Sequence, residues 1–290
     1  MAYITVGREN SESIDLYYED QGNGSTVVLV HGYPLSGRSW EKQTSASALL
    51  DAGYRVVTYD RRGFGESSKP ATGYNYDTLA GDLDTILTKL DLHDVALFGF
   101  SMGGGEVARY LGRFGSRRVR MAGFISSITP FLLKTADNPH GVGRSVFDGL
   151  KAGIASDRYA TVAAFTNNLY NSDVLKGSRV SEQVIQVSFN VGVSASPAAT
   201  LQCVDAWLED FRPDIARIDV PVLVVHGDQD RIVPIDSGGR CMEALIKSGT
   251  YEELPGAPHG CIWTHAAEVN RLMLEFIETA ALGDRAMQLH

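Results

Sequence analysis

Residues 95–105 read Val95-Ala96-Leu97-Phe98-Gly99-Phe100-Ser101-Met102-Gly103-Gly104-Gly105, and this stretch decides the fold of the chain. An apolar run of strand character ends in the pattern Gly-x-Ser-x-Gly, and the helix-forming run 106–111 follows directly. The pattern predicts a strand, a sharp turn and a helix, with Ser101 at the apex of the turn. Small residues at Gly99 and Gly103 leave room for such a turn. We therefore expect the Ser101 hydroxyl to stand clear of the sheet, beside free backbone N–H groups.

A serine hydroxyl is a weak nucleophile at neutral pH, so it needs a base, and the base needs an orienting acid. A turn of this kind predicts both residues downstream, first the acid and then a histidine. Asp230 follows the apolar run 221–227 in a polar loop, and His259 lies in a Pro/Gly-rich loop after the short strand 251–254. Ser101, Asp230 and His259 are therefore the predicted catalytic residues.

Asp228 is the alternative to Asp230 as the acid, since both lie in the same loop. We favour Asp230, because the apolar Ile232 and Val233 follow it and would bury one side of its carboxyl group. Asp228 is expected to stabilise the turn, which is the usual role of Asp in loops. Ile232 is itself a candidate for the wall of the substrate pocket.

A second loop, 31–35, reads His-Gly-Tyr-Pro-Leu and follows the short apolar strand 26–30. Acyl transfer places negative charge on a carbonyl oxygen, and two preorganised N–H groups stabilise that charge. The expected donors are the backbone N–H groups of Tyr33 and of Met102, the residue after Ser101. Pro34 has no N–H to donate, and it restricts the conformation of Tyr33, which fixes the direction of the Tyr33 carbonyl.

Strand and helix signals alternate along the chain. Strands are expected near residues 13–19, 26–30, 55–60, 95–99, 121–126, 220–225 and 250–254. Helices are expected near residues 39–52, 77–90, 102–114, 237–248 and 265–281. This alternation predicts the α/β class, with a mostly parallel central sheet and helices on both faces. The chain order of the serine, the aspartate and the histidine is the one that the α/β-hydrolase fold requires.

The strand signal is absent from the middle of the chain. Amphipathic segments replace it at residues 144–155, 158–169 and 181–191. We interpret residues 129–215 as a helical cap, inserted after the sixth core strand and placed over Ser101. Residues 1–128 and 216–282 then form the core, and residues 283–290 form a tail that is expected to fray.

Aromatic side chains of the predicted cap are candidates for the wall of a substrate pocket. Most aromatic residues at helical spacing belong to the core, so only some of them are expected to face the site. The candidates are Phe131, Phe165 and Phe189.

The composition of the chain argues against several classes of function. The net charge of −9 argues against partners such as nucleic acid or anionic membranes. The three cysteines are scattered without a Cys-x-x-Cys pair, so we expect no zinc site, no other metal, no cofactor and no disulfide framework. The N-terminus lacks the apolar core of a signal peptide, and no apolar run approaches membrane-spanning length, so a cytoplasmic protein is expected. The sequence leaves open whether copies of the chain form a homo-oligomer.

The chain resembles the cofactor-free haloperoxidase, aryl esterase and perhydrolase branch of the α/β-hydrolases. The matching segments are residues 31–36, 59–67, 101–110, 138–139, 146–150, 218–223 and 226–234. The most specific of them is the block Gly-Gly-Gly-Glu-Val-Ala-Arg-Tyr, which ends at Tyr110. The resemblance implies a catalytic triad of Ser101, Asp230 and His259. It also implies an oxyanion hole formed by the N–H groups of Tyr33 and Met102.

The resemblance further implies that Pro34 matches a proline that accompanies perhydrolysis. In that reaction hydrogen peroxide replaces water as the group that attacks the acyl group on Ser101. The Tyr33 carbonyl accepts a hydrogen bond from the peroxide, and the released peracid oxidises halide outside the site. The expected partners are therefore a small aryl or short-acyl ester and peroxide.

Two alternatives to this function remain open. An amidase, γ-lactamase or lactonase would use the same triad, because cleavage of C–N and C–O bonds differs mainly in how the leaving group is protonated. A ligand receptor derived from a hydrolase would keep the fold and triad and would signal by movement of the cap. The dehalogenases and epoxide hydrolases of this fold need an aspartate nucleophile, which Ser101 excludes.

Overall fold

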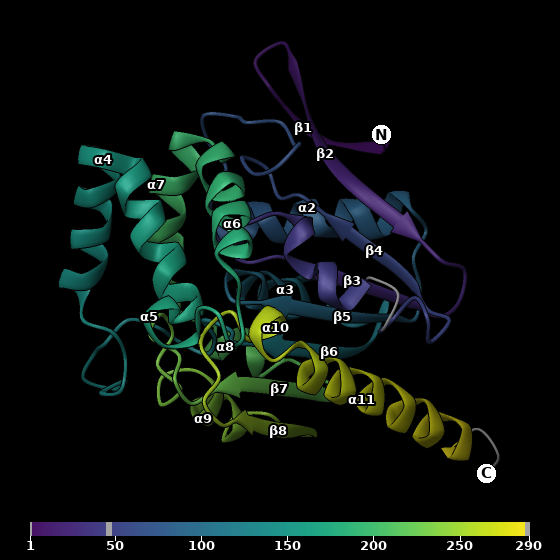
Figure 1. Cartoon of the computed structure of the whole chain (residues 1–290). Helices are drawn as coiled ribbons and strands as arrows, with labels where there is room; N and C mark the ends of the chain where they lie inside the picture. Colours follow the sequence, from purple (N-terminus) through teal and green to yellow (C-terminus); the bar gives the residue numbers. More distant parts are fainter. Residues whose placement is uncertain (1, 45–47, 288–290) are drawn as a thin grey trace.

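The computed structural model describes residues 2–44 and 48–287 and has a single sheet at its centre (Figure 1). The sheet has eight strands in the order β1-β2-β4-β3-β5-β6-β7-β8. β2 pairs antiparallel with both β1 and β4, and all other neighbours are parallel. The predicted α/β class with a mostly parallel sheet is therefore confirmed.

Each of the seven expected strands is present, and one strand is additional. The strands are β1 (Ala2–Glu9), β2 (Glu12–Gln21), β3 (Thr26–Val30), β4 (Arg55–Tyr59), β5 (Val95–Phe100), β6 (Val119–Ile125), β7 (Val222–Gly227) and β8 (Gly249–Leu254). The additional strand is β1, which lies at the edge of the sheet, with only Ile4 among its residues buried. An edge strand with so little burial carries a weak apolar pattern, which is why the sequence did not indicate it.

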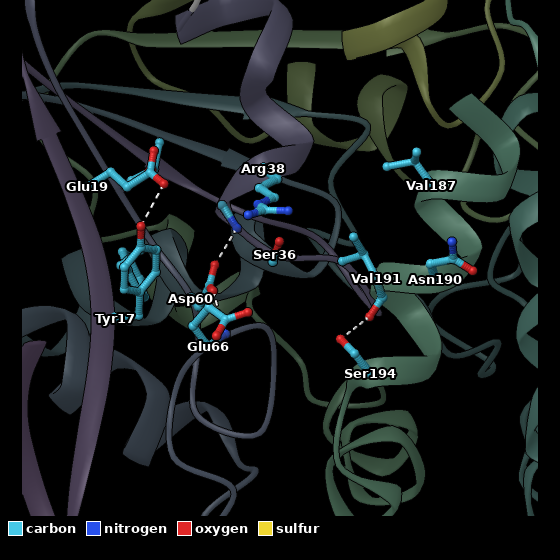
Figure 2. A pocket seen from close by; sticks show the side chains of 13 residues that line it. Tyr17, Glu19, Ser36, Arg38, Asp60, Glu66, Val187, Asn190, Val191 and Ser194 are labelled. Atoms are coloured by element: carbon cyan, nitrogen blue, oxygen red, sulfur yellow. Dashed lines mark hydrogen bonds between the residues drawn. The ribbon is translucent and has the colours of Figure 1, made fainter. Parts of the chain in front are cut away.

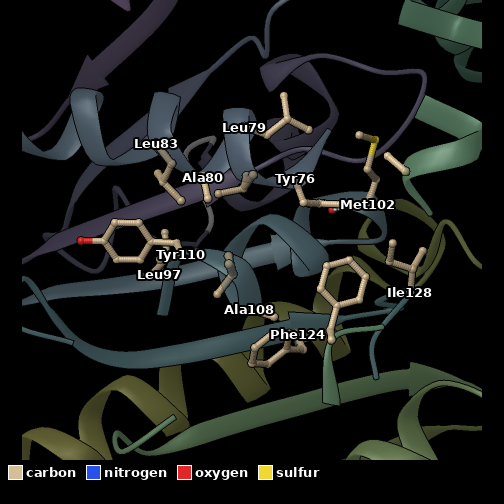
Figure 3. Packing of buried hydrophobic residues seen from close by; sticks show 14 of the residues in the cluster. Tyr76, Leu79, Ala80, Leu83, Leu97, Met102, Ala108, Tyr110, Phe124 and Ile128 are labelled. Atoms are coloured by element: carbon tan, nitrogen blue, oxygen red, sulfur yellow. Dashed lines mark hydrogen bonds between the residues drawn. The ribbon is translucent and has the colours of Figure 1, made fainter. Parts of the chain in front are cut away.

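Helices cover both faces of the sheet. α2 (Tyr76–Lys89) and α3 (Met102–Phe114) lie on one face, and α11 (Ala266–Met287) lies on the other. Alternate residues of the central strands serve the two faces, as β geometry requires: Val28 packs in the cluster with α2 and α3, and Val27 packs in the cluster with α11. Figure 3 shows part of the first cluster, in which side chains of α2 and α3 meet those of β5 and β6.

Two expected helices are much shorter in the structure. Instead of a helix over 39–52, the chain forms η1 (Gly37–Trp40) and α1 (Glu41–Thr44), and turns follow at residues 48–53. Hydrogen bonds from Gly53 N to Leu50 O and from Tyr54 N to Leu49 O close these turns. Instead of a helix over 237–248, only α9 (Gly239–Glu243) forms, after the non-helical Gly238. In both regions the apolar spacing resembled that of a helix, but the local turns and glycines override it.

Between β6 and β7 the chain forms a run of helices, which we call the helical segment (residues 126–221). Its helices are α4 (Arg144–Tyr170), α5 (Ser172–Leu175), α6 (Glu182–Ser194), α7 (Pro197–Ala206) and α8 (Arg212–Ile215). The helical character expected from the sequence is present, and α5, α7 and α8 are additional. The short α8 packs against α3, so the segment returns to the sheet before β7 begins.

The long helix α4 is broken at Asp157, whose φ of −148° and ψ of 92° are not helical. The Asp157 carboxylate accepts a hydrogen bond from Ala160 N at 2.9 Å and so caps the second half of the helix. The break falls between the predicted segments 144–155 and 158–169.

At the C-terminal end, α11 continues to Met287. The predicted tail is therefore helical over residues 283–287, and residues 288–290 lie outside the described part. Over residues 2–44 and 48–287, no helix is both long enough and apolar enough to cross a membrane.

Candidate active site

Ser101 lies at the apex of a sharp turn between β5 and α3. Its φ of 55° and ψ of −120° are unusual for a residue with a side chain, and such a conformation persists only where the surroundings enforce it. A Cβ added at Gly99 would lie 2.5 Å from the Gly103 carbonyl oxygen, and one at Gly103 would lie 2.3 Å from the Val30 carbonyl oxygen. Both positions therefore require glycine, as the sequence pattern indicated.

The structure brings the three predicted catalytic residues together. His259 Nε2 lies 2.7 Å from Ser101 Oγ, and His259 Nδ1 lies 2.7 Å from Asp230 Oδ2. The three side chains come from turns that follow β5, β7 and β8. Because these strands are parallel, their carboxyl ends meet at one edge of the sheet, where ligands bind in open α/β folds. With the Nδ1 proton donated to Asp230, His259 Nε2 is free to accept the serine proton.

The Asp230 carboxylate is fully buried and has several hydrogen-bond donors. Its Oδ1 accepts from Ile232 N at 2.9 Å and from Val233 N at 2.8 Å, while its Oδ2 faces His259. Burial alone would raise the pKa of Asp230. The positive charge of protonated His259 and the hydrogen bonds from His226 and His259 outweigh burial and hold this pKa well below its usual range. Asp230 is therefore a carboxylate at every pH near neutrality.

His226 is a contact of Asp230 that the sequence did not indicate. It is buried at the end of β7, and its Nε2 lies 2.9 Å from Val233 O and 3.2 Å from Asp230 Oδ2. His226 could have been found from the sequence, because it lies four residues before Asp230 at the end of the same strand.

Asp228, the alternative acid, lies elsewhere in the turn. Its Oδ1 accepts a hydrogen bond from Gly256 N at 2.7 Å and so joins the loops after β7 and β8. This is a turn-stabilising contact of the kind expected for Asp228.

The loop after β3 lies directly against the serine. A Cβ added at Gly32 would lie 3.0 Å from Ser101 Cβ, so the two turns are in contact. Within the described residues, the N–H groups of Tyr33 and Met102 donate to no protein acceptor, and the Tyr33 carbonyl accepts no protein hydrogen bond. Two unpaired N–H groups beside a serine hydroxyl form a suitable site for a developing oxyanion. The Tyr33–Pro34 peptide bond is cis.

A buried polar network supports this loop from below. The Arg61 guanidinium donates to the His31 carbonyl at 2.8 Å and to Glu106 Oε2 at 2.7 Å. The Arg61 backbone N–H donates to His31 Nε2 at 3.0 Å, and Tyr59 donates its hydroxyl proton to Glu106. Because all four side chains are buried, these bonds fix the position of the loop that carries Tyr33.

A cavity of about 310 Å³ opens beside Ser101. Its wall is formed mainly by α4, by the loop before α4 and by the loop after β7, with Trp207 on a further side. The other residues that line it are Tyr33, Ile128, Leu132, Val142, Val146, Phe147, Leu150, Thr161, Ala164, Phe165, Asn168, Arg231, Ile232 and Val233. The helical segment thus covers Ser101 with a mostly apolar surface.

Phe165 and Ile232 line this cavity, as expected, whereas Phe131, Phe189 and Pro34 do not. Phe131 is buried away from it, with the Arg212 guanidinium 4.9 Å from its ring centre. Phe189 lies off the buried face of α6, which is formed by residues 185, 188 and 192. Pro34 is buried and faces Gly192 of α6. For Phe131 and Phe189 the expectation that they line the pocket is corrected. The expected role of Pro34, which is to direct the Tyr33 carbonyl, stays a prediction.

Another cavity, of about 360 Å³, lies between η1 and α6 (Figure 2). Its polar residues include Ser36, Arg38 and Asp60, and Asp60 accepts from Gly37 N at 2.7 Å and from Glu66 N at 2.8 Å. Among the described residues that line this cavity, none is a histidine, so its serines have no base. The nucleophile with its base is therefore found in the cavity beside Ser101. In the part of the chain that the structure describes, no group of three or more His, Cys, Asp or Glu side chains is placed to hold a metal ion.

The sheet, the turn at Ser101 and the covering helical segment define an α/β hydrolase. The family described as having the alpha/beta hydrolase fold matches residues 25–266, and the chain belongs to this family.

Three similar proteins place the chain within that family. A protein of Synechocystis sp., provisionally described as a non-heme chloroperoxidase, is 55% identical over 96% of this chain and 100% of its own length. The bifunctional esterase/perhydrolase of Acinetobacter calcoaceticus is 33% identical over 96% of this chain and 100% of its own. The crystal structure of a bromoperoxidase from Bacillus anthracis has a TM-score of 0.91 at 42% identity, covering 96% of this chain and 99% of that one. The chain is thus a member of the non-haem haloperoxidase branch.

Proposed function

We propose that this protein is a serine hydrolase that cleaves small aryl or short-acyl esters through an acyl-enzyme and also transfers the acyl group to hydrogen peroxide. The observation that carries the proposal is the chain of two 2.7 Å contacts from Ser101 through His259 to Asp230. This chain ends at an apolar cavity and beside two unpaired N–H groups.

In the first half of the reaction, His259 Nε2 takes the Ser101 proton while Ser101 Oγ attacks the acyl carbon. The N–H groups of Tyr33 and Met102 stabilise the oxyanion of the tetrahedral intermediate. His259 then donates the proton to the departing alkoxide or phenoxide oxygen, and the acyl group stays on Ser101. Asp230 keeps His259 in the required tautomer and stabilises its charged form.

In the second half, water or hydrogen peroxide gives a proton to His259 and attacks the acyl carbon. Collapse of the intermediate returns that proton to Ser101 and releases a carboxylic acid or a peracid. The Tyr33 carbonyl, which has no donor among the described residues, can accept a hydrogen bond from the attacking peroxide. A peracid released in this way would oxidise halide in solution.

The relatives support both halves of the proposal. The Acinetobacter relative is an esterase and perhydrolase, and the bromoperoxidase of Bacillus anthracis shares the fold at 42% identity. The proposed partners are accordingly a small ester and peroxide. A cytoplasmic location and a lack of nucleic-acid or membrane partners stay predictions from the sequence.

The test is the Ser101→Ala variant. Turnover of p-nitrophenyl esters should fall by roughly 10⁴-fold or more, because triad members act as a unit. A fluorophosphonate should label the wild type at Ser101, as read by mass spectrometry of the modified peptide. Lactams, and acetate with peroxide, belong in the same substrate panel, since an amidase or lactamase would prefer the former.

The matched control is Ser127→Ala. Ser127 is also a buried serine beside α3, but its hydroxyl bonds to Thr129 Oγ1 at 2.8 Å and has no histidine partner in the part of the chain that the structure describes. This variant should keep ester turnover and fluorophosphonate labelling. Near-normal turnover in Ser101→Ala would refute the proposed function. Saturable ester binding without turnover in the wild type would favour a receptor.

A further inference from the structure

Arg231 is the one formally charged side chain among the described residues that line the cavity beside Ser101. The remainder of that lining is mostly apolar, apart from hydroxyl groups and the Asn168 amide. An apolar substrate alone would not need a guanidinium at this place.

The polar residues Asn168 and Arg231 line the cavity where the end of α4 meets the loop after β7. Asn171, at the end of α4, donates its side-chain N–H to Gln229 O at 2.8 Å, which joins α4 to the loop that carries Arg231. Asn168 lies in the last turn of α4, three residues before Asn171. Asn168 and Arg231 therefore lie at the same rim of the cavity, and both line it.

The present partner of the Arg231 guanidinium is the carboxylate of Asp173, which is exposed to solvent. Arg231 Nη1 and Nη2 donate to Asp173 Oδ1 and Oδ2 of α5 at 2.7 and 3.2 Å, and the two side chains are 43% and 63% exposed. Water screens the attraction within such an exposed pair, so the carboxylate of a substrate can exchange with the carboxylate of Asp173. A guanidinium can bind such a carboxylate through two parallel hydrogen bonds.

We propose that Arg231 selects esters in which the part that occupies the cavity carries a carboxylate at its far end. The inference rests on the proposed ester hydrolysis and names its substrate class: half-esters of dicarboxylic acids with an apolar chain between the two carbonyl groups. The apolar wall takes the chain, Ser101 attacks the ester, and Arg231 binds the distal carboxylate at the rim.

The test compares two activated esters of equal length. p-Nitrophenyl hydrogen adipate carries the distal carboxylate, and p-nitrophenyl adipamate carries a neutral amide of the same shape. The measured quantity is the ratio of kcat/KM for the first ester to that for the second. Arg231→Gln should lower this ratio by about fivefold or more, because it removes a charge-assisted bond. Arg231→Lys should keep part of it, and Asp173→Asn should raise it by freeing the guanidinium.

Arg179→Gln is the matched control. Arg179 also forms an exposed ion pair, with Glu268 at 3.3 Å, but it does not line the cavity. It changes the net charge by the same amount, so it should leave the ratio at the wild-type value. The effect at Arg231 should also shrink as ionic strength rises.

A ratio in Arg231→Gln within twofold of the wild-type ratio, with both esters still cleaved, overturns the inference about Arg231 and leaves the proposed function intact. If the wild type cleaves neither ester, the proposed function fails, and this inference fails with it.

Discussion

The turns at the edge of the sheet (the lower region) and the helical segment that covers them (the upper region) are fixed by different forces. In the lower region, Ser101, His259 and Asp230 are held by short hydrogen bonds, and their side chains are almost fully buried. Above, the cavity wall consists mainly of apolar side chains on α4, and one of them, Val146, is 60% exposed. Directional bonds specify the position of reacting atoms, whereas apolar contacts specify only shape and volume. Substitutions below should therefore change the rate for every substrate, and substitutions above should change the preference among substrates.

The largest test of this contrast compares two aspartates in one turn. Asp230→Asn should lower kcat by roughly 10³- to 10⁴-fold, because an amide leaves His259 in the wrong tautomer. Asp228→Asn should lower kcat only slightly, since Asp228 bonds to Gly256 N and not to His259. Steady-state kinetics with one ester decides between them. The reverse ranking would move the acid to Asp228.

A substitution at Pro34 tests the contact between the two regions, because Pro34 follows Tyr33 and faces Gly192 of α6. Pro34→Leu should misdirect the Tyr33 carbonyl while leaving the Tyr33 N–H in place. Perhydrolysis should therefore fall relative to hydrolysis by roughly five- to thirtyfold, the value of one hydrogen bond of about 1–2 kcal/mol. The measurement is the ratio of peracid to acid formed from one ester in the presence of peroxide. Equal loss of both products would mean that Pro34 only supports the loop.

Phe165 and Phe131 test the upper region. Phe165→Ala enlarges the cavity, so the ratio of kcat/KM for long against short acyl esters should rise by about tenfold, within the range that one or two methylenes provide. Phe131→Ala should lower the free energy of unfolding by about 3–5 kcal/mol without changing that ratio, because Phe131 is buried outside the cavity. A changed acyl preference in Phe131→Ala would contradict the cavity lining described above.

The smallest expected effect is on the pH dependence of the free energy of unfolding. Burial, with the nearby Arg61 charge, lowers the pKa of His31 well below its ordinary value. The unfolded chain takes up a proton near pH 6.5 and the folded chain does not, so the free energy of unfolding falls as pH drops below about 6.5. The slope for one such group reaches about 1.4 kcal/mol per pH unit. Urea unfolding of the wild type and His31→Gln at several pH values should show a steeper slope in the wild type. Part of the slope remains in the variant, because burial also lowers the pKa of His265.

His93→Gln serves as the control for His31, because His93 is an exposed loop histidine. It should keep the pH dependence of the wild type. The same slope in His31→Gln as in the wild type would assign the pH dependence to other groups.

The sequence predicted the lower region well because each of its residues follows a recognisable strand and turn. Ser101 lies between two glycines that the turn requires, and Asp230 and His259 follow β7 and β8 in polar or Pro/Gly-rich loops. The chemistry is thus encoded locally, even though the three residues are far apart in the chain.

The upper region was predicted as helical but not residue by residue. Phe131, Phe165 and Phe189 look alike in sequence, and only Phe165 lines the cavity. Helical periodicity indicates which residues share a face, but it does not say which neighbour that face contacts. The wall contributed by Val142, Leu150 and Trp207 depends on how α4 and α7 pack together, and no local pattern carries that information.

The break in α4 at Asp157 separates two sets of wall residues that can evolve independently. Val146 and Leu150 lie before the break, and Thr161, Phe165 and Asn168 lie after it. In an unbroken helix, one inserted residue turns everything beyond it by about 100°. Here the Asp157 cap restarts the helix, so an insertion or a grafted sequence within residues 144–156 would leave the second half in register. The first half of α4 is therefore a suitable cassette for laboratory evolution of substrate range.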